Sequence, residues 1–250
     1  MQVIVNGLLT CYKEQGSGKA VVLLHGWGDN SSSFDKLSYD LSKKYRVISL
    51  DLPGFGGTQT PNEVWGLDEY AKFVSSFLGK VNINSTWALI GHSNGGSICI
   101  RGVSKGWLNP ERLVLMASAG IRGTQKGRMK LMSFVAKTGK TISKPLPEST
   151  RKKLRSKLYS SIGSDMLIAE SLQESFKKIV ADDVRSDAKQ LMLPTLLIYG
   201  EKDEQTPLLY GKIYHELIAD STLEVLPGVG HFVFKERPVE VLKSIEVFLT

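Results

Sequence analysis

The segment Gly91-His92-Ser93-Asn94-Gly95 constrains the fold more than any other part of this 250-residue chain. The apolar run 86–90 before it predicts a buried strand, and the small-residue stretch 94–106 after it predicts a helix. A serine on so tight a strand-to-helix turn has its hydroxyl raised clear of the sheet, and flanking glycines remove side chains that would collide across the turn. Free N–H groups at the helix start would favour developing negative charge beside Ser93. The segment therefore predicts an accessible serine at a strand end.

Strand and helix patterns alternate along most of the chain. An Asn6-Gly7 turn predicts an antiparallel hairpin, and continuous apolar runs such as 20–25 are typical of strands buried on both faces. Strands are predicted at 2–6, 8–14, 20–25, 46–51, 86–90, 111–117, 194–199 and 222–226. Helices are predicted at 32–44, 67–81, 94–106, 206–218 and 236–249. This alternation predicts an α/β fold, with a mostly parallel sheet and helices on both of its faces.

Residues 121–188 interrupt this alternation. Their apolar positions follow helical spacing, and Pro145 and Pro147 break the segment. The segment lies between the sixth and seventh predicted strands, so we interpret it as an inserted helical cap. The predicted organisation is then an α/β core of residues 1–120 and 189–250 with a cap over 121–188.

The positive charge of the chain is concentrated in one segment. The formal net charge is +7, with 32 basic and 25 acidic residues. Residues 121–165 hold twelve Lys or Arg and two acidic residues, a local charge of +10, which leaves −3 for the rest. A basic run such as 151–155 is most simply a solvated helix face, although it could attract an acidic substrate or an anionic membrane. Because no nucleic-acid module accompanies it, we expect no nucleic-acid partner.

The composition also limits where the chain acts. Hydrophobic residues make up 42% and charged residues 23%, which are globular proportions. No apolar run approaches the roughly 18–20 residues that a membrane-spanning helix requires. The first Lys is residue 13, so the start lacks the basic region of a signal peptide. We therefore expect a cytoplasmic protein without a transmembrane segment.

A serine hydroxyl is a poor nucleophile and requires a base with a third group to orient it. His231 follows the last predicted strand, and Asp203 follows the strand before it. Loops after the carboxyl ends of strands are where the active sites of open α/β sheets collect. The order Ser93, Asp203, His231 along the chain is that of a nucleophile, an acid and a base on one known fold. We predict these three as catalytic residues.

The other histidines and acids have simpler interpretations. His92 is expected to point into packing, His25 to hold the backbone of its loop, and His215 to lie on the surface. Asp51 is expected to bond turn amides. Glu201 and Glu204 remain weaker alternatives to Asp203.

Two backbone groups and a set of apolar side chains complete the predicted site. The N–H groups of Trp27 and Asn94 would form an oxyanion hole, and the Trp27 side chain would shape the pocket wall. The cap's apolar residues could line an acyl pocket or could equally be its own packing stripe. The substrate-binding candidates are Trp27, Met129, Met132, Phe134 and Phe232.

Five segments, in their order along the chain, resemble the α/β-hydrolase fold superfamily over nearly the whole sequence: HGWGDNSSSF, DLPGFGGT, GHSNGG, YGEKDEQTP and GVGHF. The resemblance implies an eight-stranded sheet with a cap after strand six. It also implies Ser93 as nucleophile, Asp203 as acid, His231 as base, and oxyanion donors at Trp27 and Asn94. Many carbon–carbon hydrolases of the group have Met where this chain has Asn94. A serine nucleophile argues against the epoxide hydrolase and haloalkane dehalogenase branches.

The expected function is a serine hydrolase that cleaves small to medium carboxylic esters through an acyl-enzyme on Ser93. Neither a metal nor a cofactor is expected, and the expected partner is a small-molecule acyl substrate. One alternative is a carbon–carbon bond hydrolase of vinylogous diketone acids, and another is an acyltransferase or perhydrolase. A non-hydrolytic ligand receptor is a further alternative that an intact triad disfavours. The sequence does not indicate the oligomeric state.

Overall fold

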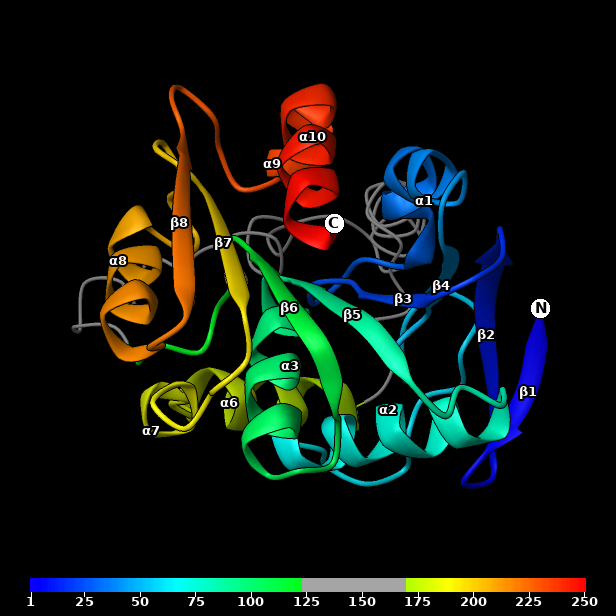
Figure 1. The fold of residues 1–250 in the computed structure, drawn as a ribbon. Coiled ribbons are helices and arrows are strands. Elements are labelled where there is room, and N and C mark those ends of the chain that lie inside the picture. The colour runs from blue at the N-terminus through cyan, green and yellow to red at the C-terminus, as the bar shows by residue number, and fades with distance from the viewer. Residues whose placement is uncertain (123–169) are drawn as a thin grey trace, which may run out of the picture.

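The computed structural model describes residues 1–122 and 170–250, whose strands form one eight-stranded sheet in the order β1-β2-β4-β3-β5-β6-β7-β8 (Figure 1). The strands are β1 (Gln2–Val5), β2 (Leu8–Gln15), β3 (Ala20–Leu24), β4 (Arg46–Leu50), β5 (Thr86–His92), β6 (Pro110–Met116), β7 (Thr195–Gly200) and β8 (Ser221–Leu226). Pairing is antiparallel from β1 to β2 and from β2 to β4, and parallel for every other pair. Together with the helices on both faces, this confirms the predicted fold class.

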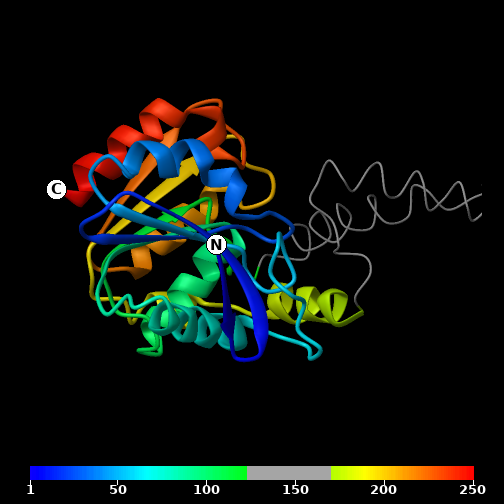
Figure 2. The same ribbon diagram turned by 90° about the vertical axis from the view of Figure 1, so that its right-hand side faces the viewer.

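Helices form a layer on each face of the sheet (Figure 2). One layer contains α2 (Leu67–Lys80), α3 (Asn94–Ser104) and α8 (Leu208–Leu217), and the other contains α1 (Asp35–Leu41) and α10 (Pro238–Leu249). Successive residues of a strand point to opposite faces. Val22 and Leu24 of β3 accordingly pack into one hydrophobic cluster, and Val21 and Leu23 into the other. Because both faces of β3 are covered, the strand required the continuous apolar run seen in the sequence.

Local signals set several boundaries. Asn6 and Gly7 have φ angles of 48° and 82°, which a two-residue hairpin turn of the predicted kind requires. The first predicted helix begins as a 3₁₀ turn, η1 (Ser31–Phe34), which Asn30 caps by accepting from the Ser32 N–H, and continues as α1. The closing helix predicted at 236–249 is α10, which begins at Pro238, because the first position of a helix requires no backbone N–H. A short helix that was not predicted, α9 (Val233–Glu236), precedes it.

The chain re-enters the described part through two helices that pack on the core. They are α6 (Glu170–Ala181) and α7 (Arg185–Ala188), and Leu172 and Ala188 are buried there. Arg101 of α3 forms ion pairs with Asp182, just after α6, and with Asp187 of α7, both at 3.1 Å. The cap candidates Met129, Met132 and Phe134, and the basic run 151–155, lie outside the described residues, so the cap stays a prediction. None of the described helices is long and apolar enough to cross a membrane.

Candidate active site

Ser93 occupies the strained turn that the pentapeptide predicted. Its backbone has φ 52° and ψ −117°, between β5 and α3. A residue other than glycine rarely adopts a positive φ, and such strain collects at functional sites. A Cβ added at Gly91 would lie 2.6 Å from the Gly96 Cα, and one at Gly95 would lie 2.7 Å from the His25 carbonyl oxygen. The two glycines are therefore required by the close approach of backbone around the turn.

The three predicted catalytic residues follow three strands that run in parallel. Ser93 comes directly after β5, Asp203 follows β7, and His231 follows β8. Since β5 through β8 pair in parallel, these positions lie at the same, carboxyl edge of the sheet. The fold therefore collects onto one edge residues that are far apart in the sequence.

Asp203 and His231 are joined directly. The His231 Nδ1 lies 2.8 Å from the Asp203 Oδ2, and both side chains are buried, at 7% and 0% exposure. An ionised carboxylate has only acceptors, so Nδ1–H must donate. The neutral ring consequently carries no proton on Nε2, which is the nitrogen that can take a proton from a nucleophile.

The Asp203 carboxylate is fully occupied by donors. Its Oδ1 accepts from the N–H groups of Gln205 and Thr206 at 2.8 and 2.9 Å, and its Oδ2 accepts from the Thr206 hydroxyl at 2.7 Å as well as from His231. Burial by itself raises the pKa of Asp203, but the hydrogen bond and charge of His231 and the bonds from Thr206 outweigh it. The net pKa of Asp203 is lowered, so the carboxylate stays ionised.

Ser93 is near this pair but is not bonded to it. Among the described residues, no hydrogen bond joins the Ser93 hydroxyl to the His231 ring, whose bonds run through Nδ1. The neighbouring His92 ring has its centroid 4.7 Å from that of His231. Bonds between a nucleophile and its base are often long without substrate and shorten in the reacting complex. Ser93 is partly exposed, as a group that meets substrate must be.

The loop after β3 lies against the Ser93 turn. A Cβ added at Gly26 would be 3.1 Å from the Ser93 Cβ, which places the next amide, that of Trp27, beside the serine. Within the described residues, neither the Trp27 nor the Asn94 N–H donates a hydrogen bond. Free backbone donors near the nucleophile are what the predicted oxyanion hole requires, and the hole itself stays a prediction.

His25 and His92 hold the loops of the site. The His25 Nε2 accepts from the Leu52 N–H at 2.9 Å, so its Nδ1–H donates to the Gly26 carbonyl at 2.8 Å. The His92 Nε2 lies 3.1 Å from the His231 carbonyl oxygen and donates to it. Burial lowers the pKa of both rings, that of His92 well below the usual value, so both are neutral. Their predicted supporting roles agree with these contacts.

The remaining alternatives also have structural partners. The Asp51 carboxylate accepts from the N–H groups of Ser31 and Gly57 at 2.8 and 2.9 Å, as predicted for a residue that bonds turn amides. Glu201 accepts from the Gly228 N–H at 2.9 Å. His215 is exposed and bonds Ser221. Each of these groups has a partner away from His231.

Aromatic side chains extend from the oxyanion loop toward the returning helix. The Trp27 ring packs against Phe55 at 4.9 Å and against Phe176 of α6 at 5.3 Å between centroids. Phe232 packs against the His231 ring at 5.3 Å. Phe176 was not predicted, because its only sequence signal is a helical stripe that reads as ordinary packing. These side chains give the described part of the site an apolar border.

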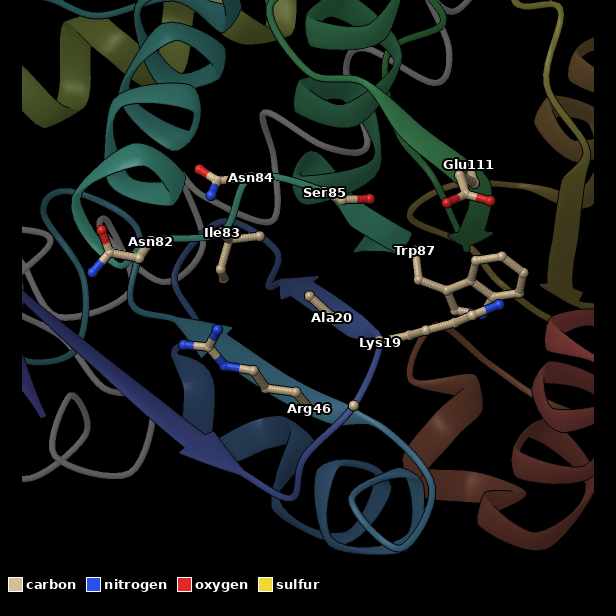
Figure 3. A pocket seen from close by; sticks show the side chains of 10 residues that line it. Lys19, Ala20, Arg46, Asn82, Ile83, Asn84, Ser85, Trp87 and Glu111 are labelled. Carbon is tan, nitrogen blue, oxygen red and sulfur yellow. The ribbon is translucent and has the colours of Figure 1, made fainter.

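A cavity at the opposite edge of the sheet contributes nothing to this site. It measures about 330 Å³ and includes Lys19, Arg46, Trp87 and Glu111, at or beside the amino ends of β3 to β6 (Figure 3). The Lys19 Nζ lies 3.2 Å from the Trp87 ring centroid, and Arg46 is paired with Glu14 at 2.7 Å. Because its cations already have partners in the protein, we assign this cavity no ligand.

Sequence reasoning also assigned no role to Thr206, which lies in the segment YGEKDEQTP, three residues after Asp203. Its hydroxyl lies 2.7 Å from the Asp203 Oδ2, 3.2 Å from the His231 Nδ1 and 2.9 Å from the Ala117 carbonyl oxygen. The sequence signal for its contact with Asp203 was a hydroxyl residue soon after an acid in a loop. Its contact with Ala117 had no such signal, because Ala117 follows a different strand, β6.

The fold and the edge that carries Ser93, Asp203 and His231 define an α/β protein with the architecture of a hydrolase. The chain belongs to the alpha/beta hydrolase family, a family of enzymes, whose model matches residues 21–244. This confirms the resemblance and the prediction that the protein is a hydrolase-family enzyme.

Individual relatives are more distant. The chain is 25% identical to 2-hydroxy-6-oxo-6-(2'-aminophenyl)hexa-2,4-dienoic acid hydrolase of Metapseudomonas resinovorans, over 99% of this chain and 90% of that protein. It is 24% identical to pimeloyl-[acyl-carrier protein] methyl ester esterase of Photobacterium profundum, over 96% and 98%. An esterase from Exiguobacterium antarcticum superposes with a TM-score of 0.82 at 22% identity, covering 99% of this chain and 98% of that one. The last comparison shows a shared fold.

Proposed function

We propose that this protein is a serine hydrolase that cleaves carboxylic esters of small to medium size through an acyl-enzyme on Ser93. The observation that carries the proposal is the bonded pair of Asp203 and His231, buried at the strand edge that also bears Ser93. The Nδ1–H bond leaves His231 Nε2 as a base on the side away from the carboxylate. The family supports hydrolysis as the reaction.

The first half of the proposed reaction forms the acyl-enzyme. The His231 Nε2 takes the Ser93 hydroxyl proton while the serine oxygen attacks the ester carbonyl carbon. Asp203 holds the ring orientation and stabilises the imidazolium that forms. The tetrahedral intermediate collapses, the imidazolium gives its proton to the alcohol, and the carbon–oxygen bond to that alcohol breaks.

The second half releases the acid. Water gives a proton to His231 Nε2 and attacks the acyl carbon, and collapse of the second intermediate returns the proton to the Ser93 oxygen. In both halves the Trp27 and Asn94 N–H groups donate to the oxyanion, and removing one such donor typically costs about 2.7–4 kcal/mol of transition-state stabilisation. Both donors are backbone groups, so a side-chain substitution at either residue leaves the hole in place.

An apolar acyl group suits the border of the site. The ring of Trp27, which follows the Gly26 backbone beside Ser93, packs against Phe176, and Phe232 packs against His231. Burial of an apolar acyl chain against such rings would be favourable through the hydrophobic effect. One relative is named as a methyl ester esterase, which supports ester chemistry.

The test is turnover of nitrophenyl esters of increasing acyl length. Wild-type protein should hydrolyse short and medium esters, and Ser93→Ala should abolish this turnover. Ser97→Ala is the matched control, because Ser97 lies one helical turn further along α3 and its buried hydroxyl has no partner in the described part. Folded wild-type protein that turns over no ester of the series would refute the proposal.

Carbon–carbon hydrolysis is the second candidate, because one relative is named as a hydrolase of a hydroxy-oxo-dienoic acid. Such a substrate carries a carboxylate, and the basic segment 121–165 provides the opposite charge. The same protein should then cleave a vinylogous diketone acid faster than any nitrophenyl ester. Transfer of the acyl group to an added alcohol or to peroxide, faster than to water, would instead indicate an acyltransferase or perhydrolase.

A further inference from the structure

The hydroxyl of Thr206 lies where three parts of the site meet. It is within 3.2 Å of the His231 Nδ1, the Asp203 Oδ2 and the Ala117 carbonyl oxygen. Ala117 directly follows β6 and has a φ of 46°, a rare conformation for a residue with a side chain. The hydroxyl thus bridges Asp203, His231 and the end of β6. In the sheet, β6 lies between β5, which precedes Ser93, and β7, which precedes Asp203.

One proton has to serve these neighbours. A hydroxyl donates one hydrogen bond and accepts two. The His231 Nδ1–H is a donor, so it can direct part of its hydrogen bond at the Thr206 oxygen while its main bond goes to Asp203. The Thr206 proton then goes to Asp203 or to the Ala117 carbonyl, and the ionised oxygen is the stronger acceptor.

The surroundings leave little room for another group to take over. The Asp203 side chain is fully buried and the whole Thr206 residue is 4% exposed, so water has poor access to the bridge. The Thr206 N–H also holds the Asp203 Oδ1, so this single residue bonds both carboxylate oxygens. A β-branched side chain on a fixed backbone has few rotamers, which keeps the hydroxyl in place.

We propose that Thr206 is a positioning residue, whose hydroxyl keeps the Asp203 carboxylate and the His231 ring in the orientation that directs Nε2 at Ser93. The inference rests on the proposed function, in which His231 is the base. During the reaction the positive charge of the imidazolium strengthens the His231–Asp203 hydrogen bond. A carboxylate that Thr206 already holds in place spends a larger fraction of its time in the orientation that this bond requires. Thr206 itself touches neither substrate nor reacting atoms.

The test compares Thr206→Val with Thr206→Ser. Valine keeps the shape and removes the hydroxyl, whereas serine keeps the hydroxyl and removes the methyl group. We expect kcat for a nitrophenyl ester to fall about tenfold or more in Thr206→Val, the effect of losing one hydrogen bond to a charged group, with KM changed little. Thr206→Ser should restore kcat to within about threefold of wild type.

A matched control separates this role from general stability. Thr195 is 1% exposed, and its hydroxyl donates to the Leu193 carbonyl at the amino end of β7, far from the catalytic edge. Thr195→Val should lower the melting temperature without lowering kcat. An equal loss of kcat in both valine variants would show that any buried hydroxyl has this effect, and would overturn the proposal.

Proton NMR of His231 gives a second readout that does not depend on turnover. The downfield signal of an Nδ1–H bonded to a carboxylate should shift or broaden in Thr206→Val and remain in Thr206→Ser and Thr195→Val. An unchanged signal together with unchanged kcat in Thr206→Val would refute the positioning role. If wild-type protein hydrolyses no ester while the signal still depends on the Thr206 hydroxyl, the proposed function is refuted. The positioning of Asp203 and His231 by Thr206 is then still supported.

Discussion

Replacing Asp203 by Asn tests how the carboxylate sets the proton position on His231. Two backbone N–H groups, of Gln205 and Thr206, point at the Asp203 Oδ1. An Asn amide has one acceptor oxygen, which these two donors would hold. Its NH₂ group then replaces the Oδ2 and faces the His231 Nδ1. The Asn NH₂ group and the His231 Nδ1–H would then be two donors facing each other, so the His231 proton must move from Nδ1 to Nε2.

The structure sets the size of the effect. Turning the Asn amide around would place its NH₂ against two N–H donors and leave both of them without an acceptor, at about 1–3 kcal/mol each, or about 2–6 kcal/mol together. The wrong tautomer is therefore favoured by roughly 30- to 10⁴-fold, because each 1.4 kcal/mol is a factor of ten. With Nε2 protonated, His231 cannot take the Ser93 proton, and kcat should fall by about 30- to 10⁴-fold.

The assay is steady-state hydrolysis of a short-chain nitrophenyl ester at neutral pH, with the urea midpoint measured for each variant. Glu204→Gln is the control, since Glu204 is exposed, lies next to Asp203, and loses the same charge. It should leave kcat within about twofold of wild type. A fall of less than tenfold in Asp203→Asn, or an equal fall in Glu204→Gln, would refute the argument from tautomers.

Three further predictions concern stability. Burial lowers the pKa of His92, so near pH 6.5 the unfolded state takes up a proton that the folded state does not. The free energy of unfolding should therefore fall as the pH drops below 6.5, by up to about 1.4 kcal/mol at pH 5.5 from this residue. In urea melts, the difference in stability between pH 7.5 and pH 5.5 should be smaller in His92→Gln than in wild type. Arg101→Met removes the cationic partner of the nearly buried Asp187 carboxylate and should lower the free energy of unfolding in urea by about 3 kcal/mol. Adding Asp187→Asn to this variant should recover part of the lost stability, and a double variant whose loss equals the sum of the two single losses would contradict this. Gly95→Ala should cost more than 2 kcal/mol, because its Cβ would meet fixed backbone, whereas Gly79→Ala, with open space around the new Cβ, should be neutral or stabilising; similar effects on the thermal midpoint in both variants would contradict the steric argument.

Much of the fold was predictable because its signals are local. Every residue of β3 is apolar, and the strand is covered on both faces. Asn6-Gly7 adopts the turn that its residue types favour. Pro238 at the start of α10 was also a local signal, and the predicted start at residue 236 overlooked it.

The candidate site was predictable where it follows from chain order and strand ends. Parallel strands deliver their following loops to one edge, so the positions of Ser93, Asp203 and His231 could be inferred before any distance was known. The contact of Thr206 with Ala117 and that of Phe176 with Trp27 could not be inferred, because these partners are distant in the sequence. A contact between residues far apart in the chain leaves no periodicity to detect.

The most direct test of the central claim is covalent labelling with a fluorophosphonate, followed by peptide mapping. Such a probe reacts with a serine only where a base activates it and an oxyanion hole stabilises the adduct. We expect one phosphonyl group per chain, on the peptide that contains Ser93, with labelling lost in Ser93→Ala and slowed at least about 30-fold in Asp203→Asn. Folded protein that remains unlabelled, or that is labelled equally well in Ser93→Ala, would contradict the central claim.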